Sequence, residues 1–287
     1  YSNIQLTINP VNLGAINNMT NCLQNCEGKY TAIYHCDDKL TPHIVQEQVN
    51  FLETHSECAA VSTGAYLING RSEVIANYQK SAYKNSKPFF ILDSGVDIIK
   101  WVLLPGSSIN MPSIMARSDV YKDKIKMLDP QYGRYSDLDL WIRLTEFGNF
   151  GILTKELMYY RRSKNSWSFS EGLRAEPSDE GISPMEDYLF NKGYIKLLPK
   201  YYINSYYFLE FKYTVIHNIK GLAYIGKTQK ELAGRLFSKN VFFASFYSLF
   251  NMKIYCIGLV VFMLGSVKTP QFVRNYLKSA YNRRYGY

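Results

Sequence analysis

The sequence predicts an α/β fold in which a largely parallel sheet is flanked by helices. Residues 30–36 have the aromatic and β-branched content of a buried strand, and residues 59–68 are expected to form the next strand. Residues 42–52 between them carry apolar side chains at helical spacing. Strand, helix and strand in alternation are typical of a parallel sheet with crossover helices. With 287 residues, 47% of them hydrophobic, the chain is long enough for one large core and a smaller second unit.

Signals at the ends of these segments suggest where the first elements begin. Residues 3–9 alternate apolar and polar side chains before Pro10, a pattern that predicts a strand. Residues 15–27 are expected to form a helix. The next helix is expected to start at Thr41, which can cap it, with Pro42 at the first helical position.

Two further helices are predicted in the middle of the chain. Residues 96–104 have the apolar content of a short buried helix. A clearer start lies at Ser136, where the serine can cap the helix and Asp137 and Asp139 fall in its first turn. Carboxylates there stabilise a helix through its dipole by about 0.3–1 kcal/mol each, so a structural role is open to both.

The charge distribution separates the C-terminal third from the rest. The whole chain has 33 basic and 24 acidic residues, a net charge of +9. Residues 192–287 hold 15 basic residues against Glu210 and Glu231, a net +13, which leaves −4 for residues 1–191. A region this basic favours phosphorylated substrates, anionic lipid or nucleic acid. We expect no nucleic-acid partner, because no nucleic-acid-binding motif is visible and the acidic motifs would then have no role.

Composition predicts three parts. Residues 1–168 form the α/β domain, residues 169–191 have the Pro, Gly, Ser and Glu content of a linker, and residues 192–287 form a helical region rich in Tyr and Phe. The five cysteines are scattered and odd in number, which favours reduced thiols. Residues 1–10 lack the pattern of a signal peptide. The expected location is therefore cytoplasmic.

Asp37 and Asp38 follow directly on the predicted strand of residues 30–36. Carboxylates at the carboxyl end of a parallel strand lie where α/β folds bind ligands. They suit Mg²⁺ or Mn²⁺ bound together with a substrate diphosphate, whose charge the cation would neutralise. His35 is either a further metal ligand or a structural hydrogen-bonding residue. The simpler alternative for the two aspartates is a turn before the next helix.

An ordered set of motifs resembles the family 2 glycosyltransferases of the GT-A fold, which is Rossmann-like. The family's motifs are Asn-Leu-Gly, Gly-Glu-Tyr-Ile, Asp-Ala-Asp-Asp before a proline-initiated helix, Glu-Asp-Tyr-Asp-Leu-Trp-Leu-Arg-Leu, and Leu-Tyr-Tyr-Arg. The matching segments of this chain are, in order, Asn12–Gly14, Gly28–Tyr30, His35–Asp38, Pro42, Ser136–Leu144 and Leu157–Arg161. The resemblance covers roughly residues 3–168.

The resemblance implies an inverting transfer of a sugar from a nucleotide-sugar donor, with Mg²⁺ or Mn²⁺ as cofactor. The family's metal-binding aspartate falls on Asp37, and His35 stands beside it as a candidate ligand. The family's catalytic base falls on Asp137, which would take the proton of the acceptor hydroxyl as that oxygen attacks the anomeric carbon. The donor-binding residues that it implies are Asp37, Asp38, Asn12 and Gly14.

The chain departs from the family pattern at three positions and at its front. His35 replaces an aspartate, Ser136 replaces the glutamate before the base, and Ser163 stands where the family often has a histidine. The family's N-terminal strand, helix and strand, which bind the base and ribose, do not precede Asn12 here. Either the chain is part of a longer enzyme, or it does not hold a sugar nucleotide in the usual way. The alternative function is a catalytically inactive GT-A-like module that binds carbohydrate or a partner at the membrane.

Residues 241–267 are almost uninterrupted apolar and aromatic sequence. Their longest charge-free piece, residues 254–267, has 14 residues, whereas a spanning helix needs about 20. We expect helices at the membrane interface whose apolar surface lies on anionic lipid. That surface would comprise Phe242, Phe246, Phe250, Leu259 and Phe262, flanked by Lys239, Lys253, Lys268 and Arg274. The alternative is a buried helical hairpin.

The resemblance and the basic region together suggest an enzyme of surface polysaccharide synthesis, peripheral on the inner face of the cell membrane. Its acceptor would be a saccharide or a polyprenyl-phosphate-linked sugar. Such a lipid-linked acceptor keeps its phosphates at the membrane surface while it presents sugar hydroxyls to the site.

Overall fold

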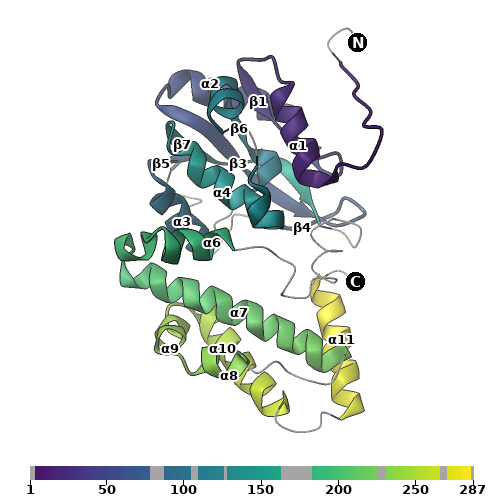
Figure 1. The fold of residues 1–287 in the computed structure, drawn as a ribbon. Coiled ribbons are helices and arrows are strands. Elements are labelled where there is room, and N and C mark those ends of the chain that lie inside the picture. Colours follow the sequence, from purple (N-terminus) through teal and green to yellow (C-terminus); the bar gives the residue numbers. More distant parts are fainter. Residues whose placement is uncertain are drawn as a thin grey trace. The chain divides into compact units, whose positions relative to one another are not determined.

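The computed structural model describes residues 4–77, 87–104, 109–125, 128–162, 183–224, 231–265 and 270–285 (Figure 1). The chain divides into two compact units. Most residues up to 192 belong to the first unit, and most residues from 193 onward belong to the second.

A mixed sheet forms the framework of the first unit. Its seven strands, among the described residues, are β1 (Tyr30–Ala32), β2 (Lys39–Leu40), β3 (Cys58–Ile68), β4 (Val74–Asn77), β5 (Phe89–Leu92), β6 (Met115–Arg117) and β7 (Asn149–Arg161). The strand order is β1-β6-β3-β7-β2, with β4 added to β3 and β5 added to β7. Side chains of β3 are buried along almost its whole length, so both faces of the sheet are covered there.

Helices and short helical turns connect these strands. The helices before residue 192 are α1 (Gly14–Gln24), α2 (Ile44–Thr54), α3 (Gly95–Leu103), α4 (Ser136–Leu144) and α6 (Pro184–Glu186). The short turns are η1 (Met111–Ser113), η2 (Val120–Ile125), η3 (Pro130–Tyr135), η5 (Asp187–Asn191) and η6 (Tyr194–Leu197). The α/β class predicted from the sequence is therefore confirmed.

The expected largely parallel sheet is wrong. Among the described residues, only β3 and β7 pair in parallel, and the other pairings are antiparallel. The difference comes from residues 71–135, which supply β4, β5 and β6 as antiparallel neighbours. An alternation of helix and strand along the sequence cannot reveal that a strand from later in the chain, here β6, lies between two earlier strands, β1 and β3.

Several predicted elements match the structure, and others do not. The strand at residues 59–68 and the helices at 15–27, 96–104 and Ser136 correspond to β3, α1, α3 and α4. The strand predicted at residues 3–9 is wrong over residues 4–9, which are extended and largely exposed without a pairing strand in the described chain. Without a neighbouring strand, these residues form none of the ladder hydrogen bonds that define a strand.

The start predicted for the second helix is also shifted. Thr41 does not cap α2, because its Oγ1 has no hydrogen-bond partner in the described chain, and its main-chain N–H donates to the carbonyl of Leu157 on β7. The helix therefore begins at Ile44, and Pro42 lies in the turn before it. Within the predicted linker, residues 183–191 form α6 and η5, whereas residues 169–182 lie outside the described residues.

The second unit is helical. It contains α7 (Lys200–Tyr224), α8 (Glu231–Leu236), α9 (Lys239–Ser245), α10 (Leu249–Gly265) and α11 (Gln271–Tyr285). Gly258 lets α10 approach α7 closely, since a methyl group there would meet the ring of Phe211 and the side chain of Val215. No helix in the described part of the chain combines the length and the apolar character needed to cross a membrane.

The apolar surface predicted for residues 241–267 is only partly present. Phe242, Phe246 and Phe250 are about half exposed or more. Leu259 and Phe262 instead pack against the buried core of the second unit, so their assignment to that surface is wrong. The predicted flanking residue Lys268 lies outside the described residues.

The contact between α2 and the sheet generates a prediction about stability. Phe51 of α2 packs against Gly151 of β7, beside Val61 of β3. A methyl group at Gly151 would overlap the Phe51 ring, so Gly151→Ala is expected to lower the free energy of unfolding by about 1–3 kcal/mol.

Chemical denaturation followed by tryptophan fluorescence measures this change. The matched control is Gly234→Ala on α8, where an added methyl group meets no atom within 4 Å. This control is expected to leave stability unchanged or to raise it by about 0.4–1 kcal/mol. Equal effects of the two substitutions would contradict the packing described for Phe51.

Candidate functional site

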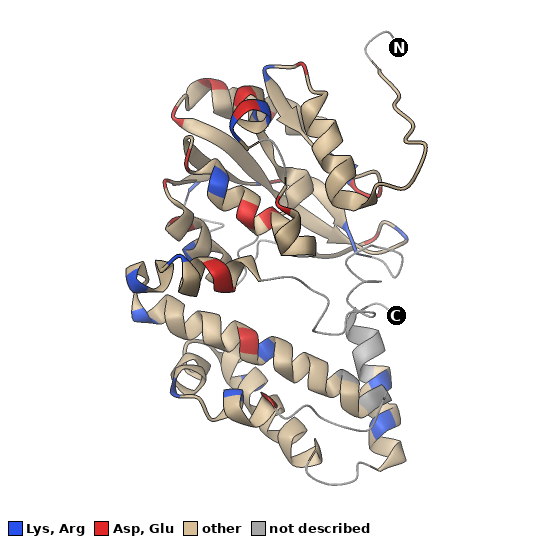
Figure 2. Ribbon diagram, viewed as in Figure 1, with Lys and Arg blue, Asp and Glu red and all other residues tan. Residues whose placement is uncertain are grey.

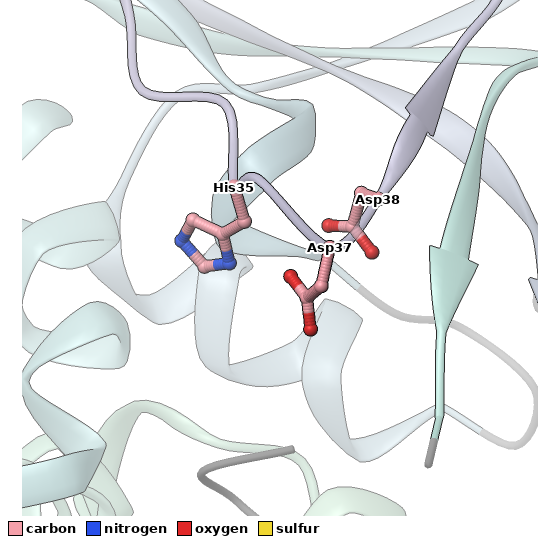
Figure 3. A group of neighbouring side chains, drawn as sticks. All are labelled: His35, Asp37 and Asp38. Carbon is pink, nitrogen blue, oxygen red and sulfur yellow. The ribbon is translucent and has the colours of Figure 1, made fainter. Parts of the chain in front are cut away.

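The loop between β1 and β2 carries three of the predicted site residues. His35, Asp37 and Asp38 project from this single loop (Figure 3). One ligand atom from each lies within 4.8 Å of the other two. His35 and Asp38 are partly buried and Asp37 is exposed, so the group is open to solvent on one side.

Burial shapes the electrostatics of this group. It lowers the pKa of His35, against the opposing effect of the Asp37 carboxylate, and therefore favours the neutral imidazole. Burial also raises the pKa of Asp38 to about 6, although the main-chain N–H of Arg161 donates to this carboxylate and acts in the opposite direction.

Two polar atoms of the group are buried and unpaired. Within the described part of the chain, neither Nε2 of His35 nor Oδ2 of Asp38 has a hydrogen-bond partner. A buried polar atom without a partner costs free energy. An unpaired carboxylate oxygen can bind a cation, and an imidazole nitrogen with two carboxylates is a set of ligands that divalent metals accept. The residues present therefore fit a metal ion.

Arg161, at the end of β7, holds this loop in position. Its main-chain N–H donates to Oδ1 of Asp38 at 2.7 Å, and its Nε donates to the carbonyl of Asp37 at 2.6 Å. The same guanidinium reaches the turn between β3 and β4, where it donates to the carbonyl of Asn69 at 2.8 Å and to Oγ of Ser72 at 3.0 Å. The sequence matched Arg161 to a family motif but gave it no role.

Asp137, the predicted base, lies in the first turn of α4. The main-chain N–H of Leu138 donates to its Oδ1 at 2.8 Å. The residue is partly buried, and burial raises the pKa of its carboxyl to about 6. Ser136, which replaces the family's glutamate, is buried and donates from its Oγ to the carbonyl of Gly133 at 2.9 Å.

The connections of α4 and β1 relate Asp137 to the loop that carries His35, Asp37 and Asp38, which we call the acidic loop. The end of α4 leads through four residues into Asn149, where β7 begins opposite Cys58 of β3, and α4 contacts β7 (Figure 1). The C-terminal end of α4 therefore lies near the start of β7. β1 runs in the same direction as β3, because β6 is antiparallel to both, so the acidic loop leaves the sheet at the edge where β3 ends.

Asp139 has a structural environment and is almost fully buried. Its Oδ2 accepts from Nε of Arg143 at 2.7 Å, and its Oδ1 accepts from the hydroxyl of Tyr188 at 2.8 Å. Tyr188 belongs to η5, so the hydrogen bond between Tyr188 and Asp139 connects α4 to residues that follow the undescribed segment 163–182. The sequence suggested an anchoring role for Asp139 but did not identify its partner, because Tyr188 lies in the segment predicted as a linker.

Asn12 and Gly14 lie at the start of α1. The main-chain N–H of Gly14 donates to Oδ1 of Asn12 at 2.9 Å, and Gly14 adopts a φ of 75° that favours glycine. A hollow of about 520 Å³ lies here, lined by residues 9–15 and Asn18. Ser163, the remaining position discussed for the site, lies outside the described residues.

Comparison with known proteins identifies one curated relative. It is a protein of Bacillus subtilis (strain 168) named "Putative glycosyltransferase EpsE", and it is 24% identical over 197 residues. The chain is similar in sequence to this relative. The alignment covers 65% of this chain and 66% of the relative, so the chain spans just under two thirds of the relative's length. No protein-family model matches the chain.

A solved structure is also similar over most of the chain. It is that of S. aureus TarS, residues 1–349, and the match covers 91% of this chain and 69% of the other. The sequence identity is 11% and the TM-score is 0.38. A TM-score this low does not establish a common fold.

The buried carboxyl of Asp137 predicts a pH-dependent gain of stability in Asp137→Asn. Because the pKa is raised from 3.8 to about 6, the folded wild type favours the protonated form and loses stability as the pH rises from about 4 to about 6. The amide loses nothing over this range. The variant should therefore be more stable than the wild type by about 1–2 kcal/mol at pH 7.5, allowing for partial exposure, and by much less at pH 4.

Denaturation curves at the two pH values measure the difference. Asp119→Asn, at an exposed aspartate, serves as the control and should change stability little at either pH. A stability difference for Asp137→Asn that does not vary with pH would show that its carboxyl is not shifted by burial.

Proposed function

We propose that the chain is an inverting glycosyltransferase of the family 2 type, which moves a sugar from a nucleotide-sugar donor to an acceptor hydroxyl. The observation that carries the proposal is that His35, Asp37 and Asp38 cluster on one loop with buried, unpartnered atoms in the described chain, and the raised pKa of the partly buried Asp137 supports it. The likeness to a relative named as a glycosyltransferase supports the same reaction class.

The cation-binding part of the site would be His35, Asp37 and Asp38. Their ligand atoms are close together, and two of these residues have buried atoms without partners in the described chain. A bound Mg²⁺ or Mn²⁺ would neutralise charge on the leaving nucleoside diphosphate. The imidazole nitrogen favours Mn²⁺, because Mg²⁺ prefers oxygen ligands. Arg161 would keep the ligand loop in place by its bonds to Asp37 and Asp38.

Asp137 would act as the general base. With a pKa of about 6, its carboxyl is mainly ionised near neutral pH yet still basic enough to accept a proton. As the acceptor hydroxyl oxygen attacks the anomeric carbon, its proton passes to the Asp137 carboxylate. The bond from the anomeric carbon to the diphosphate oxygen breaks on the opposite face, which inverts the configuration.

The donor and acceptor follow from the resemblance. Asn12 and Gly14, beside the hollow at the start of α1, would contact the donor together with Asp38. The acceptor would be a saccharide or a polyprenyl-phosphate-linked sugar, in surface polysaccharide synthesis. The protein would be cytoplasmic and peripheral on the inner face of the cell membrane.

A second candidate is a catalytically inactive module that binds carbohydrate. The observation that favours it is the structural use of Ser136, whose hydroxyl bonds to Gly133 where the family has a glutamate. The two candidates differ in turnover, because only the enzyme releases nucleoside diphosphate from a sugar nucleotide.

Turnover is the first test. The chain is incubated with Mn²⁺, a panel of UDP-, GDP- and dTDP-sugars and oligosaccharide acceptors, and the released nucleoside diphosphate is measured. We expect release with at least one donor, and a loss of about 10²–10⁴-fold in kcat for Asp137→Asn because the amide cannot accept the proton. Asp119→Asn, at an exposed aspartate elsewhere, should keep wild-type turnover.

Wild-type turnover in Asp137→Asn would remove this residue from the mechanism. Absence of turnover with every donor, combined with saccharide binding in calorimetry, would favour the inactive binding module.

Metal binding is the second test, and its readout does not depend on turnover. Mn²⁺ titrated into the chain and followed by electron paramagnetic resonance should bind at one site, and Asp37→Asn should weaken that binding by at least about tenfold because a ligand is lost. Cys36→Ser is the matched control, since Cys36 is exposed in the same loop and is not among the clustered ligands. Equal Mn²⁺ affinity in wild type and Asp37→Asn would overturn the proposed metal site.

A further inference from the structure

Exposed aromatic side chains gather on one part of the second unit. We define the aromatic face as Phe242, Phe243, Phe246, Leu249 and Phe250, which lie on α9, on the turn after it and on the start of α10. Their exposed fractions run from 47% for Phe242 to 91% for Leu249. Contiguous exposed apolar side chains of this kind mark a binding surface rather than an ordinary solvent-facing helix.

Helix α9 shows that this exposure is not a by-product of core packing. Val241, Ala244 and Ser245 on the same helix are buried and supply its contact with the core of the second unit. The phenylalanines stand on the other side of the helix, where charged or polar residues are usual. The helix is therefore apolar on both sides, although only one side contributes to the core.

A groove runs beside the aromatic face. It has a volume of about 470 Å³ and is lined by Lys200, Tyr201, Asn204, Phe242, Phe243, Phe246 and Tyr247. The rings of Tyr201 and Tyr247 stack at 4.7 Å, and Nδ2 of Asn204 donates to the Tyr247 hydroxyl at 2.6 Å. Asn204 is almost fully buried, and its Oδ1 has no hydrogen-bond partner within the described chain.

Positive charge surrounds this apolar region. Lys200 and Lys239 are exposed at the starts of α7 and α9, and Lys253 is exposed on α10. The Nζ of Lys200 lies 5.7 Å from the ring centre of Phe243, which sets the charge directly beside the aromatic face. In Figure 2 the helices of the second unit carry mainly blue charged positions, in agreement with the net +13 of residues 192–287.

We propose that the aromatic face inserts into the interfacial layer of an anionic phospholipid bilayer, with Lys200, Lys239 and Lys253 on lipid phosphates. Apolar area drives the burial of such a surface, and the lysines add attraction to anionic lipid. A second copy of the chain is a poorer partner for this surface, because it would bring another strongly positive region against the first.

This inference differs from the surface expected from sequence alone. It moves the contact from residues along the whole of 241–267 to α9, the turn after it and the start of α10, with Lys200 of α7 beside them, since Leu259 and Phe262 pack against the core. It does not depend on sugar transfer. If both hold, the bilayer contact places the chain where the phosphates of a lipid-linked acceptor lie.

Vesicle co-sedimentation tests the proposal on the whole chain. The probe is a series of vesicles of phosphatidylcholine mixed with phosphatidylglycerol, at low and at high salt, with pure phosphatidylcholine vesicles for comparison. We expect binding to the mixed vesicles that is stronger at low salt and persists in part at high salt, because the apolar contribution remains. Failure of the wild-type chain to bind mixed vesicles at low salt would overturn the proposal.

Two sets of variants separate the apolar and charged contributions. Phe243→Ser with Phe246→Ser should lower vesicle binding by about 100-fold at either salt concentration. Lys200→Gln with Lys239→Gln should lower it by about tenfold or more at low salt and by much less at high salt. The matched controls are Phe272→Ser on α11 and Lys124→Gln in the first unit, both at exposed residues, which should bind as the wild type does.

Further measurements test whether the variants are folded and whether the aromatic face forms a dimer contact instead. Circular dichroism should show the same helix content in all variants, because the substituted side chains are exposed. Unchanged vesicle binding by the phenylalanine pair would overturn the proposal, as would a wild-type dimer, seen by light scattering, that this pair dissociates. Asp137→Asn should bind vesicles like the wild type, so failure of the membrane contact and failure of the proposed sugar transfer are distinguishable.

Discussion

The parallel pairing of β3 with β7 is the constraint on which the first unit depends. It runs from Cys58 opposite Asn149 to Ile68 opposite Arg161, so two strands far apart in sequence are fixed along their full length. The pairing brings Gly151 under Phe51 of α2, which attaches that helix to the sheet. Four residues join α4 to β7, and the end of β7 bonds to the acidic loop, so both the helix of Asp137 and that loop are connected to this one pairing.

The candidate site contains two of the buried polar atoms that lack a partner in the described chain. Gln48, which is fully buried on α2, accepts from the hydroxyl of Tyr34 and donates to the carbonyl of Ser113, so its polar atoms are satisfied. The buried atoms of His35 and Asp38 are instead left without partners in the described chain. Residues that lower stability in this way persist when they serve a ligand or a reaction, and perturbed pKa values gather at such sites.

The second unit uses its aromatic residues in two different ways. Phe211 and Phe208 are buried in the helical core, where Gly258 allows α10 to pack closely against α7. The phenylalanines of α9 are exposed although they belong to an equally apolar stretch of sequence. Composition alone cannot separate these groups, because both are aromatic residues among lysines, and only the helix packing decides which side faces the core.

Local signals in the sequence determined the parts that depend on near neighbours. The alternation of strand and helix signals predicted β3, and the acidic first turn after Ser136 predicted α4, although Ser136 donates to the carbonyl of Gly133 and does not cap the helix. The clustering of His35 with Asp37 was visible because the two lie on one short loop. Only the tertiary structure decided the antiparallel strands, the absence of a strand at residues 4–9 and the role of Arg161. Arg161 bonds to the carbonyl of Asp37 across 124 residues of sequence. Such contacts form only when distant segments of the chain meet in the folded protein. Secondary-structure propensity and side-chain periodicity act over a few residues and carry no information about them.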